Sequence, residues 1–215
     1  MRWNPYMVGL IVASASLVAC EGTDPVAPSN GDVSTVSPAT APVIVTTEPI
    51  NEFPGSGSGI SGEATLTRTS DGLSVDQDVE GLTPGNAYTV WWAIWDNPQQ
   101  CEHSPCEPSD LFVRAAQGSL VNGGGFVAAA TTQFYSSELA RHDVEGRQVW
   151  VGDASGVDNT YGAQVHVVLR DHGMAVADPA DLAVQTSTFN GFCNPVCANV
   201  SDAVFLTPKA PGQGL

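Results

Sequence analysis

The sequence predicts an all-β protein, an antiparallel β-sandwich of about eight short strands with Greek-key connections, which follows an extended N-terminal tether. First, apolar and polar residues alternate with period two over several short runs, as they do in strands with one buried face. Second, the 22 Gly and 15 Pro residues gather between these runs and favour turns. Third, no window shows the sustained apolar repeat of an amphipathic helix. Short strands separated by turns are typical of sandwiches and barrels.

The expected strands follow one another closely along the chain. Apolar and polar residues alternate within 63–69 and within 73–80. The turn signal Ser70-Asp71-Gly72 lies between these two runs, so together they predict a hairpin. Residues 87–96 form the strongest candidate strand. Further strands are expected at 111–114, 125–134, 148–151, 163–171, 182–188 and 200–206, and a single helical turn at 136–141.

The first 19 residues predict a lipoprotein signal peptide. Arg2 precedes a weakly polar and apolar run, residues 7–19, that is too short for a membrane-spanning helix of about 20 residues. The run ends in Leu17-Val18-Ala19-Cys20, which resembles the bacterial lipobox. The resemblance implies acylation at Cys20 and cleavage before it. An ordinary signal peptide with an incidental cysteine is the alternative.

A multiply acylated terminus would make the lipid bilayer a partner of this chain through Cys20. Glu21 follows the cysteine where an inner-membrane retention signal would have aspartate. We therefore expect a lipid-anchored protein of the cell envelope, with the outer membrane favoured, facing the periplasm or the surface.

The composition divides the rest of the chain into three parts. Residues 20–58 are rich in Pro, Ser and Thr, carry acids but no basic residue, and predict an extended tether. Within it, only 43–47 has the pattern of a strand, which would lie at a sheet edge. The sandwich domain is expected at 59–208 and a tail at 209–215. The net charge of −16 argues against nucleic acid as a partner.

The four cysteines other than Cys20 predict two disulfides, because an even number of cysteines is typical of exported domains. Three connectivities are possible. The favoured one is local, with each bond closing a short Pro-containing loop; it joins Cys101 to Cys106 and Cys193 to Cys197. The alternative is a zinc site built from both pairs, together with His103.

Several polar residues are candidates for binding metal, although no cofactor is expected to be required. His166 and His172 lie on one face of a predicted strand, but six residues at 3.3 Å each separate them by about 20 Å. Together with His103 and His142 they are candidates for Cu or Zn. Two acid-rich stretches are candidates for Ca²⁺ or are simply solvated surfaces; they contain Asp76, Asp78 and Glu80, and Asp153, Asp158 and Asn159.

The strand 87–96 is apolar on both faces. Val90, Trp92 and Ile94 share one face, and Trp91, Ala93 and Trp95 share the other. Either a loop, such as the one closed by Cys101 and Cys106, covers the second face, or that face is exposed. Trp91 and Trp95 are therefore candidates for contacting a small molecule, a glycan or a protein.

Two stretches resemble a group of uncharacterised exported bacterial proteins over residues 63–206. They run from Gly81-Leu82-Thr83-Pro84-Gly85 to Asp110-Leu111, and from His166 to Cys197. This resemblance implies no activity. The Gly81-Leu82 turn and a strand histidine are also similar to the CHRD domain, whose copper chemistry would need His-x-His ligands that this sequence lacks. The sequence therefore favours a non-enzymatic binding or envelope-associated module, with a metal-binding protein or metalloenzyme as the alternative.

Overall fold

The structure is a computed structural model that describes residues 41–152 and 156–208. The predicted signal peptide, the predicted lipidation site Cys20, the first part of the predicted tether and the predicted C-terminal tail lie outside these residues. The fold described below belongs to the compact unit formed by residues 40–215.

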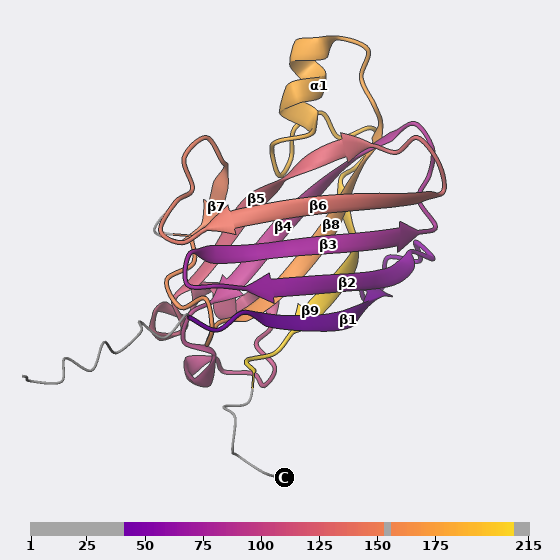
Figure 1. Cartoon of the computed structure of the whole chain (residues 1–215). Helices are drawn as coiled ribbons and strands as arrows, with labels where there is room; N and C mark the ends of the chain where they lie inside the picture. Colours follow the sequence, from indigo (N-terminus) through magenta and orange to yellow (C-terminus); the bar gives the residue numbers. More distant parts are fainter. Residues whose placement is uncertain (1–40, 153–155, 209–215) are drawn as a thin grey trace, which may run out of the picture. The chain divides into compact units, whose positions relative to one another are not determined.

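Nine strands form one antiparallel sheet in the order β6-β3-β2-β1-β9-β8-β4-β5-β7 (Figure 1). The strands are β1 (Ile44–Glu52), β2 (Ser61–Arg68), β3 (Gly72–Glu80), β4 (Asn86–Trp95), β5 (Gly118–Val127), β6 (Thr132–Ala140), β7 (Val149–Val151), β8 (Gln164–Met174) and β9 (Ala198–Phe205). The all-β, antiparallel prediction is confirmed. The described strands form a single curled sheet, a half-barrel, where the sequence predicted a sandwich of about eight strands.

The sheet curls at β1, which changes partners along its length. Ile44 to Ile50 pair with β2, whereas Asn51 and Glu52 pair with β9. In Figure 1 the strands β6, β3, β2 and β1 lie in front of β5, β4 and β8. The main apolar core lies inside this curl. Leu66 and Val75 contribute to it from one half of the sheet, and Trp92, Ile94 and Val167 from the other.

Side chains bring β5 and β6 together, although these strands are not neighbours in the sheet order. Ser137 on β6 donates a hydrogen bond to the carbonyl of Gly123 on β5 at 2.7 Å, and accepts one from Trp92 Nε1 at 3.0 Å. Arg147 donates to the carbonyls of Asn122 and Glu138 at 3.0 and 2.6 Å. These bonds satisfy backbone groups at the open side of the half-barrel.

Six of the expected strands are confirmed: 63–69, 73–80, 87–96, 148–151, 163–171 and 200–206 coincide closely with observed strands. The expected strand 125–134 is wrong, since it contains the end of β5, a turn and the start of β6. The helical turn expected at 136–141 is also wrong, because these residues pair with β3 as part of β6.

Two expected strands are helical in the structure. Residues 111–114 lie in the short 3₁₀ helices η2 (Pro108–Phe112) and η3 (Arg114–Ala116). Residues 182–188 begin inside the helix α1 (Pro179–Gln185). Asp178 caps α1 by accepting hydrogen bonds from the backbone N–H groups of Ala180 and Asp181, and Pro179 occupies the first turn. These are strong helix-start signals that outweigh the apolar pattern.

The predicted domain boundary after residue 58 is wrong, because β1 lies within the predicted tether. β1 is also an inner strand rather than the edge strand expected at 43–47.

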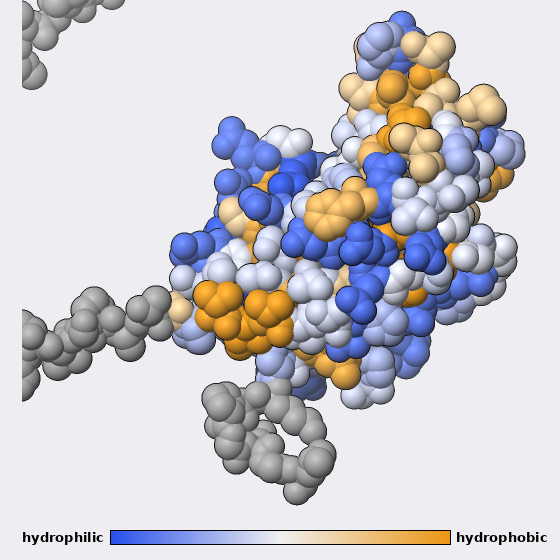
Figure 2. Space-filling view, turned by 45° about the vertical axis from the view of Figure 1, so that its right-hand side comes forward, coloured by the Kyte–Doolittle hydropathy of each residue, from blue (hydrophilic) through white to orange (hydrophobic). Residues whose placement is uncertain are grey.

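A remaining 3₁₀ helix, η1 (Pro98–Gln100), follows β4. None of the described helices is long and apolar enough to cross a membrane. Figure 2 shows one face of the molecule, on which hydrophilic side chains predominate and apolar ones gather in separate patches.

Candidate functional site

The outer face of β4 is covered by other parts of the chain. Trp91, Ala93 and Trp95 point away from the main core and form a second apolar cluster with residues of the 98–117 loop and with Phe189. Neither Trp91 nor Trp95 has any exposed surface. Of the two alternatives from the sequence, the loop cover is therefore the correct one, and these tryptophans do not form an exposed patch.

An apolar cavity of about 590 Å³ lies on this outer face. Its floor is formed by strands β4, β5, β8 and β9, with Ala93, Leu120 and Val168 among the floor residues. Loops on both sides supply the walls, and Trp91 and Trp95 line the cavity from beneath. We refer to it below as the outer-face cavity.

Aromatic side chains dominate the walls of the outer-face cavity. Trp150 stacks on Phe189 with ring centroids 4.9 Å apart, and Phe189 meets Trp91 edge-on at 5.0 Å. Trp150 is 48% exposed and Phe112 is 76% exposed, so these two rings present the apolar surface that Trp91 and Trp95 do not. Phe53, in the segment after β1, also lines the cavity.

A small polar group interrupts the apolar lining. His166 on β8 and Asp202 on β9 both line the cavity, with 3.9 Å between His166 Nδ1 and Asp202 Oδ2. Gln164 Nε2 lies 2.8 Å from His166 Nε2. The Gln164 amide is itself fixed, because its Oε1 accepts from Cys106 N–H at 3.0 Å and its Nε2 donates to the Cys106 carbonyl at 3.1 Å.

Burial decides the charge state of this polar group. It lowers the pKa of His166 to about 4, so the imidazole is neutral at neutral pH. Burial also raises the pKa of Asp202. No charge cancels that of Asp202 when His166 is neutral, because the described residues place no other basic group in an ion pair with it.

The other strand histidine, His172, belongs to a separate hydrogen-bonded group. Its Nδ1–H donates to the Gly191 carbonyl at 2.9 Å, and its Nε2 accepts from the Thr89 hydroxyl at 2.8 Å. Thr89 in turn accepts from Trp91 Nε1 at 2.8 Å. Burial lowers the pKa of His172. This side chain therefore fixes the position of Trp91 and leaves no ring nitrogen unsatisfied.

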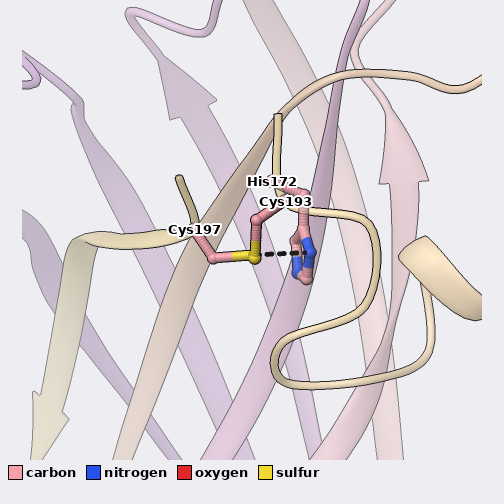
Figure 3. Close-up of side chains that lie close together, drawn as sticks. All are labelled: His172, Cys193 and Cys197. Carbon is pink, nitrogen blue, oxygen red and sulfur yellow. Dashed lines mark hydrogen bonds between the residues drawn. A yellow bond between two sulfur atoms is a disulfide. The ribbon is translucent and has the colours of Figure 1, made fainter. Parts of the chain in front are cut away.

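His172 also lies against the second disulfide, as Figure 3 shows. Both local cysteine pairs form disulfides, Cys101 with Cys106 and Cys193 with Cys197, as the favoured connectivity predicted. Cys197 Sγ lies 3.2 Å from His172 Nδ1, and ligand atoms of His172, Cys193 and Cys197 lie within 4.8 Å of one another. Metals bind the thiolate form of cysteine, so these donors fit a metal only after the disulfide is reduced.

The structure does not bring the four candidate histidines together. His103 lies 3.2 Å from the buried Asp110 carboxylate in the 98–117 loop. His142 contacts Asp158 at 2.7 Å at another site. Asp76, Asp78 and Glu80 alternate with buried residues along β3, which supports the solvated-face interpretation. Among the described residues these acids form no group with the spacing of metal ligands, and Asp153 lies outside those residues.

Three lining residues, Asp202, Trp150 and Phe189, and the Gln164 that holds His166 were not identified from the sequence. Gln164 and Asp202 are two of several polar residues in their strands, and Trp150 and Phe189 are isolated aromatics in a short strand and a loop. They meet only because distant parts of the chain pack together.

Comparisons with known proteins give no match: neither a family model, nor a curated protein, nor a solved structure is significantly similar to the chain. Any function must therefore follow from the chemistry of the site.

Proposed function

We propose that this protein is an exported, lipid-anchored binding protein of the cell envelope that holds a small, mainly apolar molecule in the outer-face cavity. The observation that carries the proposal is the cavity itself. Its volume of about 590 Å³ falls within the range of about 300–1,000 Å³ that is usual for small-molecule sites. Its lining of aromatic and aliphatic side chains with a few polar groups is also typical of such sites.

The polar groups of the cavity favour binding over acid–base catalysis. A general base works best when its pKa is near the ambient pH, whereas burial lowers the pKa of His166 to about 4. Gln164 also occupies His166 Nε2, which would otherwise be the free base. These groups are suited to orienting a ligand.

Ligand binding is tested with the fluorescent apolar probe N-phenyl-1-naphthylamine, which brightens in apolar surroundings. We expect saturable binding, and a Kd about tenfold higher for Trp150→Ala, because the variant loses a large aromatic wall. Phe134→Ala is the matched control, since Phe134 is 58% exposed and does not line the cavity. Absence of saturable binding to the unmodified protein would contradict the proposal.

The anchor is tested by metabolic labelling with an alkyne fatty acid. The lipobox-like Leu17-Val18-Ala19-Cys20 leads us to expect labelled protein in the membrane fraction. Cys20→Ser should lose the label and the membrane association, and Glu21→Gln should keep the label. Equal labelling of Cys20→Ser and the unmodified chain would contradict the anchor.

One observation favours a second candidate function, metal binding by His172, Cys193 and Cys197 after reduction of their disulfide. Zinc titration after treatment with a phosphine reductant tests it. A metal-binding protein should take up one equivalent only when reduced, lose it in His172→Gln, and keep it in His142→Gln.

A further inference from the structure

We infer that the outer-face cavity selects a ligand with a hydroxyl group, an alcohol or a phenol, which His166 Nδ1 and the Asp202 carboxylate hold between them. This inference rests on the proposed binding function and names the chemical class of its ligand.

The hydrogen on His166 is fixed by its neighbour. Gln164 Nε2 is a donor, because its amide oxygen already accepts from Cys106 N–H. His166 Nε2, 2.8 Å from Gln164 Nε2, must therefore accept a hydrogen bond. In a neutral imidazole the other nitrogen then carries the hydrogen, so Nδ1–H is a donor that faces Asp202 across the cavity.

Asp202 supplies the matching acceptor. An ionised carboxylate only accepts hydrogen bonds. Among the described residues, none hydrogen-bonds to His166 Nδ1 or to the Asp202 carboxylate, although their side chains are only 10% and 17% exposed. Arg170, on the same face of β8, directs its guanidinium to Phe189, Asn190 and Asn199 instead.

The separation of the two groups fits one inserted oxygen atom. At 3.9 Å, His166 Nδ1 and Asp202 Oδ2 are too far apart for a direct hydrogen bond. An oxygen atom at a usual hydrogen-bond distance of about 2.8 Å from each can reach both. A hydroxyl accepts from Nδ1–H and donates to the carboxylate, so it satisfies both partners.

Other head groups match this pair less well. An ammonium group donates to Asp202 but cannot accept from His166 Nδ1–H. A carboxylate would be repelled by Asp202 and by Glu107, which also lines the cavity. The paired donor and acceptor, His166 Nδ1–H and the Asp202 carboxylate, therefore favour a hydroxyl over an ammonium or a carboxylate.

The test compares ligands that share one ring system and differ in the head group. Naphthalene, 2-naphthol, 2-naphthoate and 2-naphthylmethylamine are used to displace N-phenyl-1-naphthylamine from the full chain. The chain carries Cys20→Ser, because an attached acyl chain would itself compete for an apolar cavity. We expect 2-naphthol to bind about tenfold more tightly than naphthalene, as hydrogen bonds to a charged group allow, and the naphthoate to bind most weakly.

Asp202→Leu and His166→Leu should each reduce the preference for 2-naphthol over naphthalene to near unity while naphthalene still binds. Asp78→Leu is the matched control, because Asp78 is an exposed acid on β3, outside the cavity lining. If Asp202→Leu does not fold, as judged by circular dichroism, Asp202→Asn replaces it and should weaken the preference.

The outcomes separate this inference from the proposed function. Equal binding of naphthalene and 2-naphthol to the starting chain overturns the hydroxyl preference and leaves apolar binding intact. Tightest binding of the amine also overturns it, and assigns the carboxylate a cationic partner. If neither the probe nor any naphthalene binds, the proposed function itself fails and the inference fails with it.

Discussion

His166 shows how position in the fold decides the chemistry of a single residue. On the sequence it is one of two histidines on the same strand face and a candidate metal ligand. In the structure it faces a cavity, it is neutral, and Gln164 fixes its tautomer. The sequence predicts which face of the strand carries His166, because strands alternate. It cannot predict that Asp202 lies near His166, because Asp202 belongs to a different strand, β9.

The pKa of His166 predicts a pH dependence of stability. Because the folded state lowers this pKa from 6.5 to about 4, the unfolded state binds more protons in that window. The free energy of unfolding should therefore fall as the pH falls from 6.5 to about 4, by up to about 3 kcal/mol from this group. His166→Asn should show a shallower decline in urea denaturation.

Asp202 acts in the opposite direction and serves as the control. Burial raises its pKa, so the folded state gains a proton first and Asp202 adds stability as the pH falls. Asp202→Asn should therefore show a steeper decline than the unmodified protein. The buried His172 contributes to all three proteins, so its effect cancels in the differences. Identical slopes for all three would contradict these assignments.

At the scale of elements, the 98–117 loop is organised by a buried carboxylate. Asp110 accepts hydrogen bonds from the backbone N–H groups of Glu102 and Glu107, both at 2.8 Å. Burial acts to raise the pKa of Asp110, but these bonds and the nearby His103 ring hold it below its usual value. Asp110 thus ties the Glu102 and Glu107 backbone to η2 and fixes the part of the loop that carries Cys106 over Trp91 and Trp95.

Asp110→Asn should loosen this cover. The amide group replaces one accepting oxygen with a donor, so a backbone N–H in the loop loses its partner, at a cost of about 1–3 kcal/mol. We expect a lower midpoint in urea and stronger acrylamide quenching of tryptophan fluorescence. The exposed Asp78→Asn should change neither quantity. Unaltered quenching in Asp110→Asn would show that the loop is held by other contacts.

The elements that sequence reasoning missed share a physical cause. Strands with one solvent-exposed face, such as β2 and β3, can be recognised because apolar and polar residues alternate along them. In contrast, 111–114 and 182–188 are short apolar runs that fit either a strand or a helix. Their helical state depends on caps and on packing over the sheet. The local disulfides were predictable because each pair closes a short loop in one segment of sequence.

For the whole molecule, the main difference from the prediction is one curled sheet in place of a sandwich. No sequence pattern indicates this directly, because the curl depends on β1 pairing with β2 along most of its length and with β9 at its end. The open side is then closed by side chains rather than by strand pairing, through Ser137 and Arg147.

Ser137→Ala should destabilise the whole fold. It leaves the buried Trp92 Nε1–H without an acceptor where β5 approaches β6, whereas the Gly123 carbonyl keeps its bond from the Tyr135 hydroxyl. Unpaired buried polar groups cost about 1–3 kcal/mol, which should lower the Tm measured by circular dichroism. The neighbouring Ser136→Ala is the control, since Ser136 is exposed and its hydroxyl donates to the Asp76 carboxylate on the outer surface. Equal Tm values for both variants would contradict the closure role.

The place of β1 has a mechanical consequence for the proposed attachment through the N-terminal end. β1 begins at Ile44 and is an inner strand that pairs with β2 from Ile44 to Ile50. A pull on the preceding segment acts along β1 and shears the hydrogen bonds of this pairing together, whereas an edge strand pulled sideways would open them one by one. Unfolding under load is governed by the rate of crossing this barrier. For the proposed lipid-anchored protein, this arrangement would keep the domain folded while the chain before Ile44 is under load.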